Sequence, residues 1–581
     1  MLMTTTVAMW SRILASLALG LLVLASSAHA AKGLAFIGFL LDEPGFALAG
    51  PRDLAMSPND GFLYVASPNN GIAVLSLDAS GGRPTHVQSV FATLPELAGC
   101  QGIAVSPDGA HVYATGNTGD AILLFDRDGG SGMLTHEQTL ADGLAGVDGL
   151  DGANQVRVSP DGLHVYAASD VDDAVAVFSR DVITGELTFV EAHFDGAGGV
   201  DGLDGAFGVA VAPDGKNVYV TGHDEDAVAV FTRDAVSGEL TFVEAHFDGV
   251  GGVDGLEDLW RVAVSPDDSH VYTASPTDDA IAVFARDAVT GTLMFVESVF
   301  TQNARSLAFS SDGLTLWVGT GIPDGATSHD RNPTTGELAF VERVTNGSRG
   351  MIGCGDVEAL ATTSGDSFLY LACELNSAVT TLQVLDVACP PAPVGGCRQT
   401  TVNGASALTM KSGITGTSDS TRKDLLSWRW KRGAATSLAE FGDPLSETDY
   451  ALCVYDASAD PQPFARGNIP ANNTCKGVPC WQLTKGQFKY RDREKVIAFD
   501  AKTTAPDGLL KVLLKPGEDG KTVIKTKQKG EGVAGYTGGL QSLARTPPVI
   551  VQVISSTGEC WEAVYSTPKL NTPGLFKAKS D

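Results

Sequence analysis

A tandem repeat is the feature that most constrains the fold of this chain. Glu186–Leu203 reads "ELTFVEAHFDGAGGVDGL", and Glu239–Leu256 repeats it with one Ala changed to Val. Around these segments the chain contains seven units that align on the tetrapeptide Ser-Pro-Asp-Gly, five of them close copies and two more divergent. Repetition with a period of about 50 residues is typical of solenoids and propellers, in which each unit packs only against its neighbours.

Each unit is predicted to form a small antiparallel sheet. A typical copy reads "VRVSPDGLHVYAASDVDDAVAVFSRD", and the units contain four short runs rich in Val, Ala, Phe, Tyr and Leu. Pro-Asp-Gly, an Asp-rich bend and the turn "RDxxTGEL" separate the runs. One four-stranded sheet cannot cover both of its own faces, so such sheets pack radially. We therefore predict an all-β chain with a seven-bladed β-propeller over residues 33–388.

The strand count predicts how the ring closes. The seventh unit ends at Leu385 without a fourth strand. The segment "LAFIGFLLDEPG", which begins at Leu34, resembles the outer-strand segment "LTFVEAHFDGVG", which begins at Leu240. We therefore expect residues 34–42 to supply the outer strand of the last blade, which leaves no exposed sheet edge.

The repeat motifs also carry a family resemblance. "SPDGxxVY" and "DAVAVFxRDxxTGEL" resemble the repeats of lactonase-type, or YVTN-repeat, seven-bladed propellers, a family that includes 6-phosphogluconolactonases. The resemblance covers residues 33–388 and implies the propeller fold. For activity it implies either hydrolysis of a sugar lactone or a binding role, because the matching residues occupy turn and core positions. It transfers no catalytic residue onto numbered positions of this chain.

The N-terminal 30 residues have the pattern of a secretory signal peptide. Arg12 precedes an apolar run from Ile13 to Ala25, and Ala28 and Ala30 form an A-x-A exit. The run is shorter than the roughly 20 residues that cross a bilayer. We therefore predict a signal peptide at 1–30, a secreted or periplasmic location, and no membrane span.

The composition changes after the propeller. Residues 389–397, "CPPAPVGGC", form a Pro/Gly/Cys linker, and 398–581 contain apolar runs separated by Gly, Asp and Pro. We predict a smaller second all-β domain, a sandwich or barrel. Nine cysteines in an exported chain indicate disulfides. The spacing suggests these pairs, with Cys100 left over and the connectivity open: Cys389 with Cys397, Cys475 with Cys480, Cys354 with Cys373, and Cys453 with Cys560.

The net charge of −29 is unevenly distributed. Residues 1–390 hold 15 Lys and Arg against 51 Asp and Glu, a balance of −36, whereas residues 391–581 hold 25 against 18, a balance of +7. Nucleic acid requires a positive surface, so it is excluded as a partner of the larger part. We expect a monomer whose acidic propeller face binds a small molecule, a carbohydrate or a protein.

Polar residues begin the inner strands of several blades, where mostly Gly, Ala or Ser would suffice. The candidate ligand-binding residues are Arg52, Arg157, Arg261, Arg305, Gln101 and Gln155. The candidate catalytic residues are Glu358, His223 and Asp53. Arginines at a channel mouth suit a carboxylate, phosphate or lactone carbonyl, and a carboxylate or imidazole can transfer a proton. The alternative is that these arginines pair with neighbouring acidic loops.

The loops that leave the outer strands repeat "DGxxGVDGL" followed by Asp or Glu. Their carboxylates are Asp142, Asp148, Asp151, Asp195, Asp201, Asp204, Asp248, Asp254 and Glu257. Carboxylates in glycine-rich loops suit Ca²⁺. Repeated Asp-Gly is also ordinary turn chemistry, in which Asp bonds to backbone N–H groups. Ca²⁺ is therefore a possible ligand, and no other cofactor is expected.

Two further patterns in the second domain have alternative interpretations. The segment "KTVIKTKQK" places four lysines on one face of a strand: Lys521, Lys525, Lys527 and Lys529. They either bind an acidic polysaccharide or the acidic propeller, or they protect a solvated edge strand from pairing. Trp428, Trp430, Trp481 and Trp561 either stack against sugars or are buried.

Two functions fit these patterns. The first prediction is an exported binding protein with an acidic, Asp/Gly-rich propeller face. The alternative is a lactonase-like hydrolase that acts at the channel mouth, and the chain's enzymatic status is left open.

Overall fold

The computed structural model describes residues 32–581 except for short gaps and four longer ones. The undescribed residues after 31 are 70, 79–81, 92–93, 347–350, 352, 387–388, 391–392, 413–424, 458–464, 472–473, 476–477, 492–508, 530–544 and 574. The predicted signal peptide at 1–30 therefore lies outside the described residues. Regular structure in the described part is β-strand, with short 3₁₀ helices at Pro95–Leu97 and Ala439–Phe441. None of its helices has the length and apolarity needed to cross a membrane.

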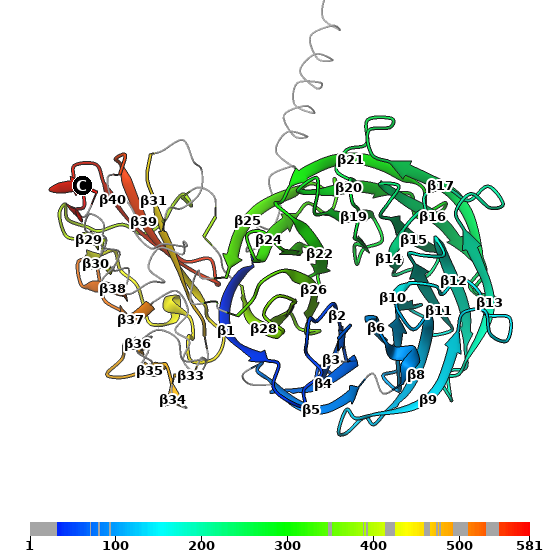
Figure 1. The fold of residues 1–581 in the computed structure, drawn as a ribbon. Coiled ribbons are helices and arrows are strands. Elements are labelled where there is room, and N and C mark those ends of the chain that lie inside the picture. The colour runs from blue at the N-terminus through cyan, green and yellow to red at the C-terminus, as the bar shows by residue number, and fades with distance from the viewer. Residues whose placement is uncertain are drawn as a thin grey trace, which may run out of the picture.

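Seven four-stranded antiparallel sheets form a ring, so the predicted propeller and all-β class are confirmed (Figure 1). The inner strands are β2 (Asp53–Met56), β6 (Cys100–Val105), β10 (Ala153–Val158), β14 (Ala206–Val211), β18 (Arg261–Val264), β22 (Ala304–Phe309) and β26 (Val357–Thr362). The second strands are β3 (Phe62–Ser67), β7 (His111–Gly116), β11 (His164–Ser169), β15 (Asn217–Gly222), β19 (His270–Ser275), β23 (Thr315–Thr320) and β27 (Phe368–Cys373). The third strands are β4 (Gly71–Leu77), β8 (Ala121–Arg127), β12 (Ala174–Arg180), β16 (Ala227–Arg233), β20 (Ala280–Arg286), β24 (Gly325–Arg331) and β28 (Ala378–Leu385). The outer strands are β5 (Pro84–Phe91), β9 (Leu134–Ala141), β13 (Leu187–Phe194), β17 (Leu240–Phe247), β21 (Leu293–Phe300), β25 (Leu338–Thr345) and β1 (Gly33–Leu41).

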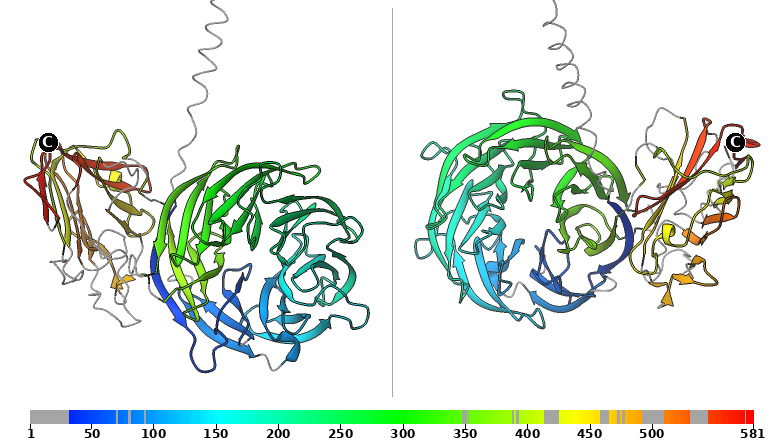
Figure 2. Two further views of the ribbon diagram at one scale, coloured as in Figure 1. Left: turned by 45° about the horizontal axis from the view of Figure 1, so that its top comes forward. Right: turned by 180° about the vertical axis from the view of Figure 1, so that it is seen from behind.

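The outer strand of the seventh blade comes from the N-terminal end of the described chain. β1 pairs antiparallel with β28, from Gly33 opposite Leu385 to Leu41 opposite Ala378 (Figures 1 and 2). Its side chains Leu34 and Phe36 are buried in the core between the sixth and seventh blades. The seventh blade is thus built from both ends of the propeller sequence. Its β1–β28 pair joins the first and last strands of the propeller directly.

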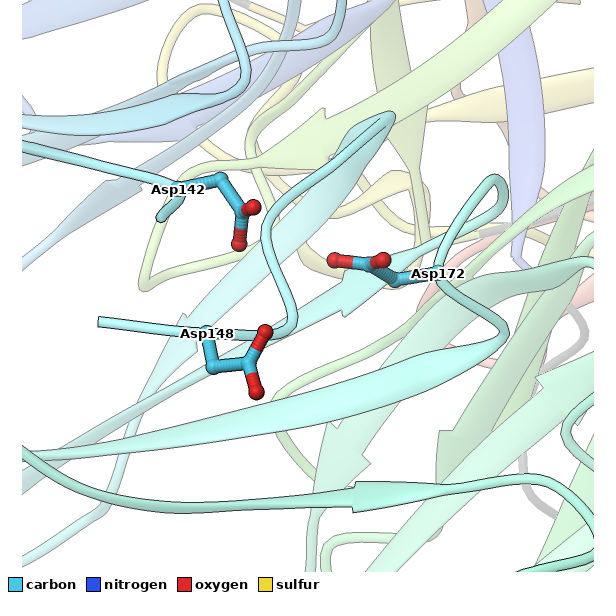
Figure 3. A group of neighbouring side chains, drawn as sticks. All are labelled: Asp142, Asp148 and Asp172. Carbon is cyan, nitrogen blue, oxygen red and sulfur yellow. The ribbon is translucent and has the colours of Figure 1, made fainter. Parts of the chain in front are cut away.

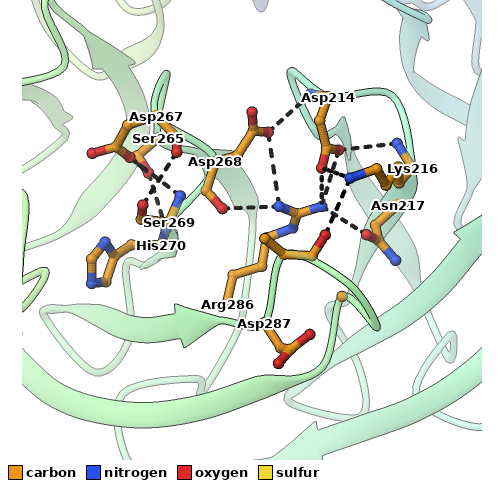
Figure 4. A network of polar contacts seen from close by, with 12 residues as sticks. Asp214, Lys216, Asn217, Ser265, Asp267, Asp268, Ser269, His270, Arg286 and Asp287 are labelled. Carbon is orange, nitrogen blue, oxygen red and sulfur yellow. Dashed lines mark hydrogen bonds and ion pairs between the residues drawn. The ribbon is translucent and has the colours of Figure 1, made fainter.

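A repeated buried arginine joins neighbouring blades and explains much of the repeat motif (Figure 4). Arg286, at the end of β20, has a fully buried side chain. It donates to the Tyr219 hydroxyl at 2.8 Å, to the Asp268 carbonyl at 2.9 Å, and to Asp214 and Asn217 of the preceding blade. A buried guanidinium is tolerated only with such partners. The Asp of Pro-Asp-Gly, the Tyr of the second strand and the Arg of the third strand are therefore one structural device.

The same device places three histidines in scaffold positions. Arg180, Arg233 and Arg331 each donate at 2.7 Å to Nδ1 of His111, His164 and His270 respectively. Burial lowers the pKa of these imidazoles, and the neighbouring arginine lowers it further. Because a guanidinium can only donate, each Nδ1 accepts this hydrogen bond and carries no proton.

The second domain is a sandwich of two antiparallel sheets. The larger sheet runs in the order β35 (Trp481–Leu483), β36 (Phe488–Arg491), β37 (Leu509–Lys515), β38 (Thr522–Lys529), β30 (Leu425–Gly433), β29 (Ala407–Lys411), β42 (Leu575–Lys579) and β41 (Leu570–Thr572). The smaller sheet runs β32 (Ala465–Ile469), β31 (Tyr450–Tyr455), β39 (Val549–Ser555) and β40 (Cys560–Tyr565), and β33 (Thr474–Cys475) pairs with β34 (Val478–Pro479). The eight-stranded and the four-stranded sheet share one core. Trp428, Trp430, Trp481 and Trp561 are buried in it and are not available to stack against sugars.

Two of the suggested disulfide pairs are wrong. Cys354 bonds to Cys373 as predicted, but Cys389 bonds to Cys453 and Cys397 bonds to Cys560. Cys453 and Cys560 lie on β31 and β40, which are separated by β39. Two strand spacings of about 4.8 Å put their Cα atoms beyond the roughly 7 Å that a disulfide bridges. The linker cysteines instead bond to this sheet at two points.

The remaining cysteines are Cys100, Cys475 and Cys480. Cys100 is a free, buried thiol whose pKa burial raises to about 12, so it is not a nucleophile. Cys480 is disulfide-bonded. The side chain of its predicted partner Cys475 lies outside the described residues.

Candidate functional site

Four of the polar residues predicted at the channel mouth, Gln101, Gln155, Arg305 and Glu358, lie in β-bulges at the start of inner strands. The pairing register shifts between Cys100 and Ile103, Ala153 and Val156, Ala206 and Val209, Ala304 and Ser306, and Val357 and Ala359. These shifts enclose Gln101, Asn154, Gln155, Phe207, Arg305 and Glu358. A bulge redirects its side chains out of the ladder and is common beside active sites. Because the inner strands adjoin one another around the ring, the bulges surround one mouth.

Glu358 is the centre of a charged cluster that spans three blades. Its carboxylate accepts from Arg52 at 3.1 Å and also from Arg305, and its side chain is 2% exposed. Arg52 also bonds to Glu374 at 2.6 Å. Arg305 lies 3.5 Å from Asp356. Three carboxylates therefore share two guanidinium groups, and the cluster has an excess of negative charge.

The exposed member of this cluster, Glu374, has the properties of a proton carrier. Burial raises its pKa, Arg52 lowers it, and the neighbouring Glu358 raises it again through its charge and a shared hydrogen bond. Its side chain is 27% exposed, whereas that of Glu358 is 2% exposed. A carboxyl with a raised pKa that reaches solvent can exchange protons with water.

A second charged group lies on the first, third and fifth blades. Asp53 is buried and accepts from Arg157 at 3.3 Å and from the Ile103 backbone N–H at 3.2 Å. Arg261 is buried near Asp53, and burial lowers the pKa of its guanidinium. It donates at 3.4 Å to the Arg52 carbonyl, which places it beside the Glu358 cluster. Asp53 is thus engaged in structural contacts.

Two aromatic rings lie against one arginine from each charged group. The rings of Phe207 and Trp260 lie 5.5 Å apart. The Arg261 guanidinium lies over Phe207 at 5.3 Å, and that of Arg305 lies over Trp260 at 5.0 Å. Both rings are partly exposed. An apolar platform flanked by two cations can hold the apolar side of a ring-shaped ligand while the arginines bind its oxygens.

His223 borders the aromatic platform. Its ring lies 6.0 Å from that of Phe207, and its Nδ1 lies 2.7 Å from Asp258. Asp258 also accepts from the Trp260 indole at 3.1 Å. No contact between His223 and the Glu358 cluster is found in the described part of the chain. His223 and Glu358, two of the predicted catalytic residues, therefore have different partners and do not contact each other in the described part of the chain.

The two glutamine candidates differ in their surroundings. Gln155 is buried, and its Oε1 accepts from the Val209 backbone N–H of the next blade at 2.8 Å. Gln101 is partly exposed at its bulge. The adjacent Gly102 has no room for a side chain, because a Cβ would lie 2.3 Å from the Asn154 carbonyl. Gln155 therefore joins blades, and Gln101 remains a candidate for ligand contact.

Glu374 and the aromatic platform were not predicted from the sequence. Glu374 directly follows a second strand, at the repeat position that His223 occupies in another blade. Comparing that position across all seven units would have found it. Asp356 was also not predicted; it lies at the positive-φ position before its inner strand, where the first four units have Gly and the next two have Asp258 and Asn303.

Two of the predicted calcium loops form carboxylate clusters, shown for the first in Figure 3. The carboxylates of Asp142, Asp148 and Asp172 converge, as do those of Asp195, Asp201 and Glu225, with ligand atoms within 4.8 Å of one another. In each cluster the third member comes from the bend after a second strand. Asp151 and Asp204 do not belong to these clusters.

The clustered carboxylates also have structural contacts. Asp142 accepts from the Leu150 backbone N–H at 3.0 Å, and Asp172 accepts from that of Asp151 at 2.9 Å. Burial raises the pKa of Asp172, and Asp142 and Asp148 raise it further. In the third loop Asp248 bonds to the Leu256 N–H in the same way. Both the turn interpretation and a divalent cation fit this geometry, and calcium binding stays a prediction.

Comparison with known proteins gives a family match and distant relatives. The family model described as "Lactonase, 7-bladed beta-propeller" matches residues 44–201, 137–254 and 250–352, which together span more than half of the chain. A 6-phosphogluconolactonase of Pectobacterium carotovorum is 25% identical over 204 residues, 34% of this chain and 59% of that protein. A 6-phosphogluconolactonase of Pectobacterium atrosepticum is 24% identical over 204 residues with the same coverage. The chain thus matches about three fifths of the length of these curated relatives.

Two solved structures are also similar. The periplasmic gluconolactonase of Pseudomonas aeruginosa has a TM-score of 0.43 and 19% identity, covering 54% of this chain and 96% of that one. The hydrazine synthase of Kuenenia stuttgartiensis has a TM-score of 0.43 and 19% identity, covering 57% and 95%.

Proposed function

Because the chain belongs to the lactonase family of seven-bladed β-propellers, we propose that it hydrolyses a lactone of a sugar-like acid at the mouth of the propeller channel. The observation that carries this proposal is that Arg52 and Arg305 meet at Glu358, with Glu374 bonded to Arg52 and with Trp260 of the aromatic platform against Arg305. These are the groups that ester hydrolysis needs: cations for an oxyanion, a proton carrier and a surface for the ring. The family membership favours this reading over the exported binding protein predicted first.

Each group has a role in the proposed reaction. The lactone ring lies against Trp260 and Phe207, and its carbonyl oxygen faces Arg305. Glu374 takes a proton from water as the water oxygen bonds to the carbonyl carbon, and the guanidinium stabilises the resulting oxyanion. The ring C–O bond then breaks as the carbonyl re-forms, and Glu374 returns the proton to the leaving alkoxide. The product is the open hydroxy acid, and Glu358 positions both arginines.

The surrounding charge favours neutral lactones over phosphorylated ones. The two charged groups at the mouth together set four arginines against four carboxylates, so they carry no net positive charge to attract an anion, and the acidic loops add negative charge around the same propeller. An anionic substrate is repelled by such a surface unless a cation offsets it. We therefore expect a higher kcat/KM for a neutral aldonolactone than for its 6-phosphate, and a smaller difference when Ca²⁺ is added.

The test is a lactone-hydrolysis assay of the mature protein with EDTA or Ca²⁺ present. Glu374→Gln should lower kcat/KM by about 10²–10⁴-fold, as loss of a general base does. Arg305→Met should lower it by about 10²–10³-fold, as loss of an oxyanion donor does. Glu239→Gln is the matched control, because Glu239 is exposed in a turn and bonds to Ser237. Absence of turnover with any lactone, or full activity of Glu374→Gln, would refute the proposal.

The pH dependence gives a second readout. Glu374 must be deprotonated to accept a proton from water, and its pKa is raised by burial. The value of kcat/KM should therefore increase as pH rises through this raised pKa. In Glu374→Gln that limb should disappear from the residual rate. A pH profile with the same limb in both proteins would assign the base to another group.

The location of the protein is part of the proposal. The described disulfides Cys354–Cys373, Cys389–Cys453 and Cys397–Cys560 suit an oxidising compartment. We propose that the chain acts outside the cytoplasm after cleavage near Ala31. N-terminal sequencing of the protein from a host with a secretion pathway tests this, and a retained Met1 would contradict it.

A further inference from the structure

The outer face of the larger sheet in the second domain carries a basic cavity that the lactonase proposal does not use. The cavity has a volume of about 390 Å³, and six cationic side chains line it. They are Arg429 on β30, Lys489 and Arg491 on β36, Lys511 on β37, and Lys525 and Lys527 on β38 (Figure 1). Of the four lysines in "KTVIKTKQK", only Lys525 and Lys527 line it. Lys521 pairs with Glu518 at 2.7 Å, and the side chain of Lys529 lies outside the described residues.

The sheet order overturns the interpretation of these lysines as guards of an edge strand. β38 lies between β37 and β30, inside an eight-stranded sheet. An interior strand has no free edge to protect from pairing with another chain. Its lysines therefore need a different explanation, and their cross-strand neighbours supply one.

The register places like charges directly opposite one another. Arg491 pairs with Lys511, and Lys511 pairs with Lys527. On the next row Lys525 pairs with Arg429. Neighbouring strands are only about 4.8 Å apart, and like charges in opposite positions destabilise a sheet. Folding thus holds these cations together against their mutual repulsion.

No carboxylate of the described residues neutralises this array. Ion pairs are found for Lys521 and Arg398 of the same domain, but none involves the six cavity cations. Leu513, half-buried between Lys489 and Lys525 in the register, adds an apolar surface to the cavity. The cavity therefore combines several unneutralised cations with one apolar contact, which suits a ligand that has several anionic groups and some apolar surface.

We propose that this cavity binds an acidic polysaccharide, a sugar chain that bears carboxylate or sulfate groups. Its volume lies in the range of roughly 300–1,000 Å³ that is usual for small-ligand sites. Single-stranded nucleic acid is disfavoured, because its bases stack on exposed aromatic rings. The one ring of the described cavity lining, Tyr490, is buried.

The test measures binding of the full mature protein to polygalacturonate and to heparin at low and high salt. The triple variant Lys511→Glu, Lys525→Glu, Lys527→Glu should weaken binding about tenfold or more, because three cation–anion contacts become repulsive. A second triple variant carries Lys411→Glu, Lys577→Glu and Lys579→Glu. It makes the same charge change at exposed positions of β29 and β42 in the same sheet and should bind like the parent protein.

The controls separate this proposal from its alternatives. Neutral dextran should not bind, and Lys→Gln changes at the three cavity positions should weaken binding without lowering the Tm, because they remove repulsion. The proposal is overturned if neither polyanion binds at low salt, or if both triple variants lose affinity equally. It is also overturned if oligothymidylate binds as tightly as the polysaccharides, or if the cavity cations mediate only self-association in sedimentation experiments. Lactone turnover should be unchanged in every variant, so failure here leaves the proposed reaction untouched.

Discussion

Substitution of Phe36 by Ala tests whether the N-terminal strand closes the propeller. Phe36 lies on β1, is 1% exposed, and packs in the core between the sixth and seventh blades. Truncation of a fully buried Phe to Ala costs about 3–5 kcal/mol through lost burial and the cavity left behind. The entropy of unfolding is about 2.1 cal/mol/K per residue, or about 0.7 kcal/mol/K for roughly 350 residues. The Tm of the propeller should therefore fall by about 4–7 °C.

The assay is differential scanning calorimetry with the disulfides intact, and hydrogen exchange assigns the affected transition to β1 and β28. Leu41→Ala is the matched control, because Leu41 ends the same strand and is 40% exposed. Its change should be within about 0.5 kcal/mol. If both variants melted at the same temperature, β1 would not be part of the propeller core, and the ring closure would have to be abandoned.

Three further predictions concern the scaffold. Burial raises the pKa of Asp449 to about 6, so the folded protein binds more protons than the unfolded chain between pH of about 4 and 6. The free energy of unfolding should therefore fall as pH rises through this window. Urea unfolding measured at several pH values should show a weaker pH dependence of this free energy in Asp449→Asn. Arg180→Met should lower the free energy of unfolding by about 3–5 kcal/mol, because it leaves buried partners unpaired. Lys216→Met changes an exposed side chain and should have little effect. Equal shifts of Tm in the two variants would contradict the structural role of the arginine. Joint replacement of Cys397 and Cys560 by Ser should destabilise the second domain by about 2–5 kcal/mol in urea unfolding, and an unchanged midpoint would mean that this bond adds no constraint.

Much of the fold could be predicted because its information is local in the sequence. Each propeller unit carries its own turn residues and strand pattern, and each blade packs only against its neighbours. The buried arginine of one unit meets the Pro-Asp-Gly turn of the unit before it, and the same contact recurs at Arg180, Arg233 and Arg286. The likeness of Leu34–Gly45 to the other outer strands also pointed to the segment that pairs with β28.

The candidate site was only partly predictable. Alignment of the units on Ser-Pro-Asp-Gly located the start of each inner strand, and Arg305 and Glu358 were found in this way. That Glu374 bonds to Arg52 could not be read from the sequence, because the two residues are 322 positions apart and meet only when the ring closes. The bulges also decide which side chains turn inward, so Gln155 joins two blades while Arg305 faces the aromatic platform.

The sequence by itself determined the number of blades, the strand order within each blade and the acidic balance of the propeller, because these follow from short repeated patterns and from composition. Only the tertiary structure decided the disulfide pairing, the partners of Glu374 and the assembly of six cations on one sheet face. Such contacts join residues far apart in the chain, and they depend on strand order and register. Shifting the register of one strand by a single residue would turn its side chains to the opposite face of the sheet.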